Sequence, residues 1–191
     1  MRSGTQLILF LGCTFCAIAT SAQTTNKVST KKIISSKKVV SAAPKVSATF
    51  FQKEMLTAIN AVRVKGYQCG DTYFGPVLKL TWEVKLQNSA KRHVNDMAIN
   101  NFFEHESSDG TQMSTRVSQA GYKWRFCCEN IALGYKDVQS AVKGWLQSEG
   151  HCENIMRSEV TQMGAARAGD YWVQDFAAPR KEGVMYVEQQ Q

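Results

Sequence analysis

The first fifty residues of this 191-residue chain contain no aspartate or glutamate. They hold one arginine and six lysines, whereas the remaining 16 basic residues are matched by 16 acidic residues. The net charge of +7 therefore belongs to the N-terminal segment, and the rest of the chain is neutral. Because a nucleic-acid ligand calls for a basic surface on the folded domain itself, the high pI gives no reason to expect one.

Long apolar runs are also lacking, since no later segment approaches the roughly 20 residues of a membrane-spanning helix. Residues 7–19 form a shorter apolar run after Arg2, and small residues follow it at 20–22. This pattern is typical of a secretory signal peptide over residues 1–22. A lipoprotein anchor at Cys13 or Cys16 is the alternative, but the residues before each cysteine fit that signal poorly.

The sequence beyond the leader divides into three parts. Residues 23–48 are Ser, Thr, Val and Lys with almost no aromatics, which predicts a basic linker. Residues 49–180 are expected to form one folded domain, and residues 181–191 a C-terminal tail. We expect the mature protein to be secreted, periplasmic or extracellular, without a transmembrane segment.

Apolar spacing predicts most of the secondary structure of this domain. Helices are expected over 51–65, 83–101 and 111–120, and a further one starts at Asp137 and is broken by Gly150. A loop is expected between the first two helices. Strands are expected around 128–131, 163–167 and 171–177. Helices surrounding a small sheet of three or more strands indicate an α+β fold.

The tetrapeptide Cys-Glu-Asn-Ile occurs twice, at 128–131 and at 152–155. The first copy follows an aromatic residue and suits a buried strand, whereas the second follows Gly150 and suits a helical turn. Nothing beyond the four letters matches, so the two copies are not an internal repeat. The two glutamates are therefore expected to lie in different local structures.

Histidine is scarce, with three in the chain. His93 lies on the apolar side of the second predicted helix and is interpreted as a core histidine. His105 and His151 lie where elements end, which is where sites are usually assembled. Two imidazoles with carboxylates can hold a divalent metal or act as general base and acid. His105-Glu106 begins like the zinc-protease HExxH, but Asp109 stands where the second histidine should be.

A resemblance to a known family is carried by four segments, which read LTWEVKLQNSAKRHVNDMAINNFFEHESSDG, GYKWRFCCENIALGY, VKGWLQSEGHCENIM and QMGAARAGDYWVQDFA. In this order they resemble the CAP superfamily of secreted proteins, in particular its bacterial branch. That superfamily includes cysteine-rich secretory proteins, antigen 5 and plant pathogenesis-related proteins. The resemblance covers about residues 51–178. It implies a three-layer α-β-α sandwich with a small, mainly antiparallel central sheet. It also implies a cleft with two histidines and two acids that often binds a divalent metal.

The resemblance assigns the site residues one by one. His105 matches the histidine of the family's H-x-x-x-D-G block, Glu129 the acid of its G-E-N-I block, and His151 the histidine of its G-H block. The fourth family acid falls on Ser148, and Glu149, one place further, is the alternative. The candidates for catalysis are therefore His105, Glu129, His151 and Glu149. His105 and His151 are the predicted ligands of zinc or another divalent metal.

After removal of the leader four cysteines remain, Cys69, Cys127, Cys128 and Cys152, which allow three pairings. Cys127 and Cys128 fall on opposite faces of the predicted strand, so a bond between them would be strained. We expect Cys69 to pair with Cys152. The other two are then buried thiols or a strained pair.

Two functions from different classes fit these observations. The first is a binding module at the cell envelope or outside the cell, with a lipid, glycan or protein ligand. The alternative is a metal-dependent hydrolase that uses His105, Glu129 and His151. The missing fourth acid and the absence of a nucleophile motif such as G-x-S-x-G favour the binding module.

Overall fold

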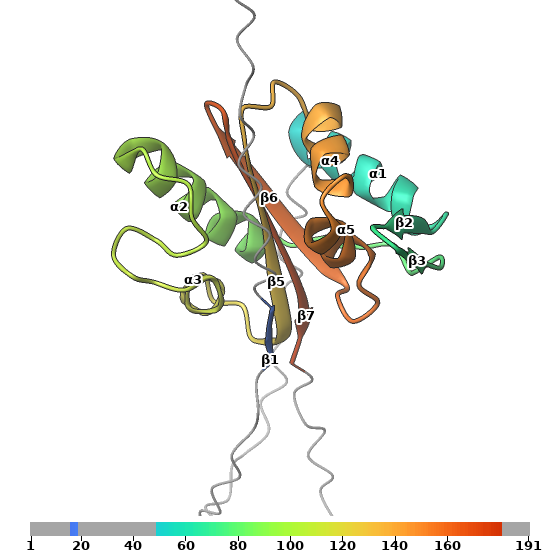
Figure 1. Ribbon diagram of the computed structural model, residues 1–191. Coiled ribbons are helices and arrows are strands. Elements are labelled where there is room, and N and C mark those ends of the chain that lie inside the picture. The colour runs from blue at the N-terminus through green and yellow to red at the C-terminus, as the bar shows by residue number, and fades with distance from the viewer. Residues whose placement is uncertain (1–15, 19–48, 181–191) are drawn as a thin grey trace, which may run out of the picture.

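The computed structural model of the protein describes residues 16–18 and 49–180 (Figure 1). The predicted linker (23–48), the C-terminal tail (181–191) and most of the predicted signal peptide lie outside the described residues, and all three remain predictions. Strand β1 (Cys16–Ile18) falls within the predicted signal peptide and pairs with the edge of the sheet.

The described chain forms five helices and seven strands. They are β1 (Cys16–Ile18), α1 (Phe50–Arg63), β2 (Tyr67–Cys69), β3 (Thr72–Phe74), β4 (Thr81–Trp82), α2 (Val84–Asn100), α3 (Met113–Gln119), β5 (Trp124–Leu133), α4 (Val138–Leu146), α5 (Glu149–Met156), β6 (Gln162–Ala168) and β7 (Tyr171–Pro179).

One central sheet separates two layers of helices (Figure 1). Its strand order is β1-β5-β7-β6-β4, and only the β4–β6 pair is parallel. Helices α2 and α3 lie on one side, and α1, α4, α5 and the β2–β3 hairpin lie on the other. The predicted α+β class, a three-layer α-β-α sandwich with a small and mainly antiparallel sheet, is confirmed.

Two of the predicted helix starts are held by side-chain capping boxes. Thr49 and Gln52 form a reciprocal capping box at α1, and Asp137 and Ser140 form one at α4. The predicted end of α4 was wrong. The helix ends at Leu146, where the chain turns into an extended residue at Ser148 before α5 begins. Gly150 therefore lies inside α5, in its first turn.

The predicted loop between α1 and α2 contains a hairpin that the sequence did not reveal. Strands β2 and β3 have three residues each and are largely exposed, so they show no apolar alternation. Gly70, at the turn, has a φ of +54°, which glycine adopts without strain.

Strand β5 serves both layers because its side chains alternate. Phe126, Cys128 and Ala132 join the core beneath α1, α4 and α5, whereas Cys127 and Ile131 face α2 and α3. The same alternation places Glu129 on the α2 side of the sheet. Strand β5, which is largely apolar on both faces, thus directs one acid, Glu129, toward the layer of α2 and α3.

Candidate functional site

Glu129 is completely buried, and both of its carboxylate oxygens accept hydrogen bonds. Nδ1 of His105 lies 2.8 Å from Oε1, and a terminal guanidinium nitrogen of Arg116 lies 2.6 Å from Oε2. Burial opposes the charge, but the bond from His105 and the positive charge of Arg116 outweigh it and lower the pKa of Glu129. Glu129 is therefore ionised. It accepts a hydrogen bond from the N–H at Nδ1 of His105, and this bond orients the ring.

Arg116 is the buried partner that the sequence did not indicate. It comes from α3, and its second terminal nitrogen donates to the carbonyls of His105 and Thr111 and to the hydroxyl of Ser107. One guanidinium thus joins the carboxylate of Glu129 to the loop that carries His105. The only available signal was indirect, because an acid on a buried strand requires a partner.

Asp175 is a second buried acid that the sequence did not single out. It stands directly opposite Glu129 in the β5–β7 register and is fully buried. Burial, followed by the neighbouring charge of Glu129, raises the pKa of Asp175 well above its usual range. Because the two pKa values shift in opposite directions, we take Asp175 to be the neutral acid and Glu129 to be the ionised one.

His93 confirms the expectation of a core histidine. Its ring is fully buried, and its Nε2 lies 2.9 Å from the carbonyl oxygen of Glu104. Burial lowers the pKa of His93 despite the nearby charge of Glu129. The neutral ring holds the chain at Glu104, the residue before His105, and so supports the loop that carries the site.

His151 approaches the site from the other helix layer. It is a half-buried residue in the first turn of α5. The pKa of His151 is lowered to about 4, mainly by burial and secondly by the positive charge that His105 can carry. The structure thus brings His151 within electrostatic reach of His105. The His151 ring is neutral at pH 7.

The two Cys-Glu-Asn-Ile copies pack against each other although they have different structures. The amide nitrogen of Asn154, on α5, donates to the side-chain oxygen of Asn130 and to the backbone oxygen of Glu129. The amide nitrogen of Asn130 donates in turn to the backbone oxygen of His151. These bonds fix the start of α5 against β5, and Glu153 takes no part in them.

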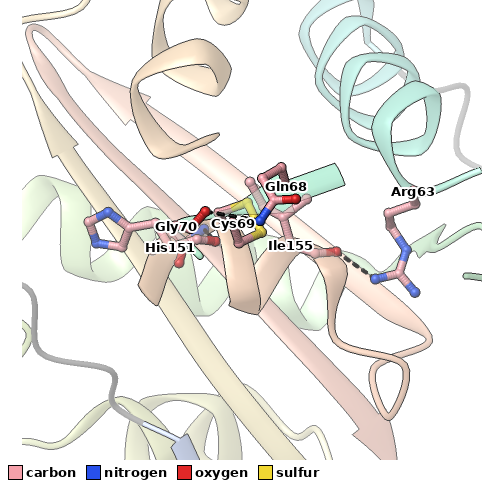
Figure 2. The surroundings of a disulfide bond; sticks show 8 residues. Arg63, Gln68, Cys69, Gly70, His151 and Ile155 are labelled. Atoms are coloured by element: carbon pink, nitrogen blue, oxygen red, sulfur yellow. Dashed lines mark hydrogen bonds between the residues drawn. A yellow bond between two sulfur atoms is a disulfide. The ribbon is translucent and has the colours of Figure 1, made fainter. Parts of the chain in front are cut away.

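The confirmed disulfide between Cys69 and Cys152 fastens α5 to the hairpin (Figure 2). At the other end of α5, the buried guanidinium of Arg63 donates to the carbonyls of Ile155 and Arg157. Burial lowers the pKa of Arg63 to about 10. In Figure 2 the ring of His151 projects from α5 on the side away from Arg63. The helix that carries His151 is therefore held at both ends.

Cys127 and Cys128 are buried on opposite faces of β5, and they bond neither to each other nor to the Cys69–Cys152 pair. Both are buried, as expected, and the strained bond between them is not formed.

Ser148 and Glu149 are the two candidates for the position of the fourth family acid. Ser148 is the N-cap residue of α5 and makes no side-chain cap bond. Glu149 is exposed, and its carboxyl carbon lies 2.6 Å from the place where a β-carbon on Gly70 would stand. Its carboxylate is therefore directed to the hairpin turn.

The predicted metal site requires several ligands that point to one place. Across residues 49–180, no three His, Cys, Asp or Glu side chains gather in an arrangement that could hold a metal ion. Both oxygens of Glu129 are already engaged by His105 and Arg116. The described side chains thus do not supply a complete coordination shell, and the metal pair of His105 and His151 remains a prediction.

No helix in the part of the chain that the structure describes has both the length and the apolar character that a bilayer crossing requires.

Comparison with known proteins gives a consistent answer. The model of the Cysteine-rich secretory protein family, CAP, matches residues 56–176. An uncharacterized membrane protein of Bacillus subtilis (strain 168), YlbC, is 32% identical over 128 residues, which is 67% of this chain and 34% of that protein. The chain thus spans about a third of the length of this relative.

Two solved structures share the fold. An extracellular protein containing a SCP domain from Bacillus anthracis str. Ames has a TM-score of 0.52 and 30% identity, over 53% of this chain and 34% of that one. An outer surface protein from Borrelia burgdorferi has a TM-score of 0.58 and 20% identity, over 67% of this chain and 92% of that one. At 20% identity the second likeness concerns the fold alone.

Proposed function

The chain belongs to the Cysteine-rich secretory protein (CAP) family, and from that premise we propose that it is a secreted binding module. It acts at the cell envelope or outside the cell, and its ligand is a lipid, a glycan or a protein. The binding surface is formed around His105 and His151, with Glu129 as the buried support of His105.

The observation that carries this proposal is the Glu129–His105 hydrogen bond together with the nearby neutral ring of His151. Glu129 and Arg116 are buried and serve each other, so they are suited to orienting His105 rather than to reacting. The two imidazoles are less buried than this support and come from opposite layers. Two imidazole rings, one on a loop held by Arg116 and one on helix α5, can recognise a ligand by hydrogen bonding without any chemical step.

Compartment is part of the same proposal. A disulfide between Cys69 and Cys152 is typical of proteins outside the reducing cytosol. The similar Bacillus anthracis protein is an extracellular one. Both observations support secretion, which the predicted signal peptide over residues 1–22 would direct.

The test uses two insoluble probes, peptidoglycan sacculi and phosphatidylglycerol vesicles, in co-sedimentation with the mature chain. We expect one probe to sediment the protein, and we expect His105→Ala and His151→Ala to weaken that binding at least about tenfold. Glu153→Gln, in the second Cys-Glu-Asn-Ile copy, is the matched control and should bind normally. If deletion of residues 23–48 alone abolishes sedimentation and the histidine variants bind normally, recognition belongs to the lysine-rich segment.

The metal-dependent hydrolase remains the second candidate because neutral imidazole is the form that ligates zinc, and burial keeps His151 neutral. Calorimetric titration of the mature chain with zinc tests it. Stoichiometric binding that disappears in both His105→Ala and His151→Ala would support a metal site made by this pair. Failure to bind zinc, with both variants folded, would remove this candidate and leave the proposed binding module.

A further inference from the structure

Strand β1 covers a short part of one edge of the central sheet. It pairs antiparallel with β5 over Phe126–Cys128, where Ala17 stands opposite Cys127 (Figure 1). Because β1 is the last strand in the sheet order, β5 becomes the outermost strand when β1 is taken away. Strand β1 belongs to the predicted leader over residues 1–22. Removal of the leader would therefore expose backbone N–H and C=O groups of β5 at this edge.

The rest of the β5 edge is closed by side chains of the helices. The carbonyl oxygen of Glu129 accepts a hydrogen bond from the amide nitrogen of Asn154 at 3.2 Å. The carbonyl oxygen of Ile131 accepts one from the indole nitrogen of Trp145 at 3.0 Å. Backbone groups of alternate residues point to the same side of a strand, which assigns those of Cys127 to this edge as well. Leader removal thus leaves a short opening around Cys127.

Residues 125–128, which we call the β5 edge, are accompanied by positive charge. Arg125 is exposed, and no ion pair between described residues involves it. The guanidinium carbon of Arg157 lies 5.3 Å from the centre of the Phe126 ring, which belongs to the same edge. The only acid of β5 is Glu129, which is buried and has both oxygens engaged. A strand that pairs with the β5 edge therefore meets cationic side chains.

We propose that the β5 edge of the mature chain binds an extended acidic peptide of a partner protein by strand addition. The peptide runs antiparallel to β5, as β1 does, and exchanges backbone hydrogen bonds with Cys127. In the register of β1, one acidic residue of the peptide stands opposite Arg125 and pairs with it across the two strands. The peptide residue before this acid stands opposite Phe126.

Charge distinguishes this occupant from the two that the chain itself could supply. The first fifty residues hold six lysines and no acid, so residues 23–48 would bring like charge to Arg125. A second copy of the chain would bring its own Arg125 and Arg157 to the same edge. Like charges that face each other weaken strand pairing, whereas an acid opposite Arg125 strengthens it.

The inference rests on one part of the function proposed above, namely the leader removal that accompanies secretion. It does not use the surface around the two histidines, because recognition runs through the backbone of β5. His105→Ala and His151→Ala should therefore bind the acidic peptide normally. Failure of this inference is thus distinguishable from failure of the proposed histidine surface.

The test is calorimetric titration of the mature chain, residues 23–191, with the N-acetylated and C-amidated peptide Thr-Val-Ala-Ile-Glu-Val. Its alanine is designed to stand opposite Cys127 and its glutamate opposite Arg125. The same peptide N-methylated at the alanine cannot donate to the carbonyl of Cys127, and it should bind at least about tenfold more weakly. Hydrogen exchange of the Cys127 amide should slow when the unmodified peptide binds.

A charge exchange tests the register of the peptide. Arg125→Glu should weaken binding about fivefold, because an attractive cross-strand pair becomes a repulsive one. Lysine in place of the peptide glutamate should weaken binding to the parent chain and restore binding to the Arg125→Glu variant. Lys53→Glu, at an exposed position on α1, is the matched control for net charge and should bind as the parent does.

The inference is overturned if the peptide does not bind, if the N-methylated form binds equally well, or if Arg125→Glu and Lys53→Glu bind alike. Slow exchange of the Cys127 amide before the peptide is added would also overturn it. In a monomer, such protection would mean that the chain's own N-terminal segment holds the β5 edge. In a dimer, it would mean that a second copy does.

Discussion

The two faces of the central sheet are built from the same strands but are stabilised by different interactions. On the α2 side, Glu129 and Asp175 face each other among Arg116 and two histidines. On the α1 side, the same two strands contribute Cys128 and Phe176 to a large apolar core. One residue step along β5 or β7 thus separates a charged cluster from a hydrophobic one.

This difference determines what each face tolerates. An apolar core loses stability in proportion to the contacts removed, and neighbours relax into part of the space. A buried ion pair behaves otherwise, because removing one partner leaves a charge without solvent or counterion. The α2 side should therefore be sensitive to single polar changes, whereas the α1 side should depend on its disulfide and large side chains.

The largest expected effect breaks the α1 side. The double variant Cys69→Ala, Cys152→Ala opens a loop of 83 residues, and the loop-entropy relation predicts a loss of about 4.5 kcal/mol in the free energy of unfolding. Guanidinium unfolding measures it. Because His105 is held from the other face, its NMR ring signals should remain near their native positions while those of His151 move. Equal movement of both would contradict the independence of the two faces.

Arg116→Met breaks the α2 side. It leaves the buried carboxylate of Glu129 with only His105, and we expect a loss of about 3–4 kcal/mol at pH 7. Arg125→Met is the matched control, since Arg125 is exposed on the same β5 strand and should change stability by less than about 0.5 kcal/mol. Equal effects of the two changes would show that the buried Arg116–Glu129 pair does not contribute to stability.

Asp175→Asn sharpens the comparison through pH. The folded-state pKa of Asp175 is raised, so the parent chain loses stability as pH rises above the unfolded value. The asparagine variant has no proton to retain. Its stability relative to the parent should therefore increase with pH, by up to about 1.4 kcal/mol per pH unit, until the folded-state pKa of Asp175 is reached. A pH-independent difference in unfolding free energy would mean that Asp175 is ionised in the folded protein.

His151→Gln tests a pH dependence of the opposite sign, in which the folded protein loses stability as pH falls. The folded-state pKa of His151 is lowered to about 4, so the unfolded chain takes up its proton first as pH falls. The parent should lose about 2 kcal/mol from this group between about pH 6.5 and pH 4, with part of the effect removed by solvent screening. The variant should lack this contribution. Both chains are compared by urea unfolding across that range, and parallel pH curves would contradict the neutral, half-buried ring.

Much of this arrangement could be predicted from local signals. Apolar spacing and the Asp137 cap located the helices, and the family resemblance pointed to His105, Glu129 and His151. The support of the site could not be predicted in this way. Arg116 and Asp175 are distant from Glu129 in sequence, and their role depends on the strand register and on how α3 packs. The β2–β3 hairpin could not be predicted because its short, exposed strands show no apolar alternation.

The buried guanidinium of Arg63 has a consequence for how the protein opens. It donates to carbonyl oxygens of Leu78, Ile155, Arg157 and Val160, which belong to two segments far apart in the chain. Separation of either segment from α1 would leave this charge with too few acceptors. The end of α1, the stretch after the hairpin and the end of α5 should therefore form one cooperative unit, whose amide hydrogens exchange with solvent at a common free energy.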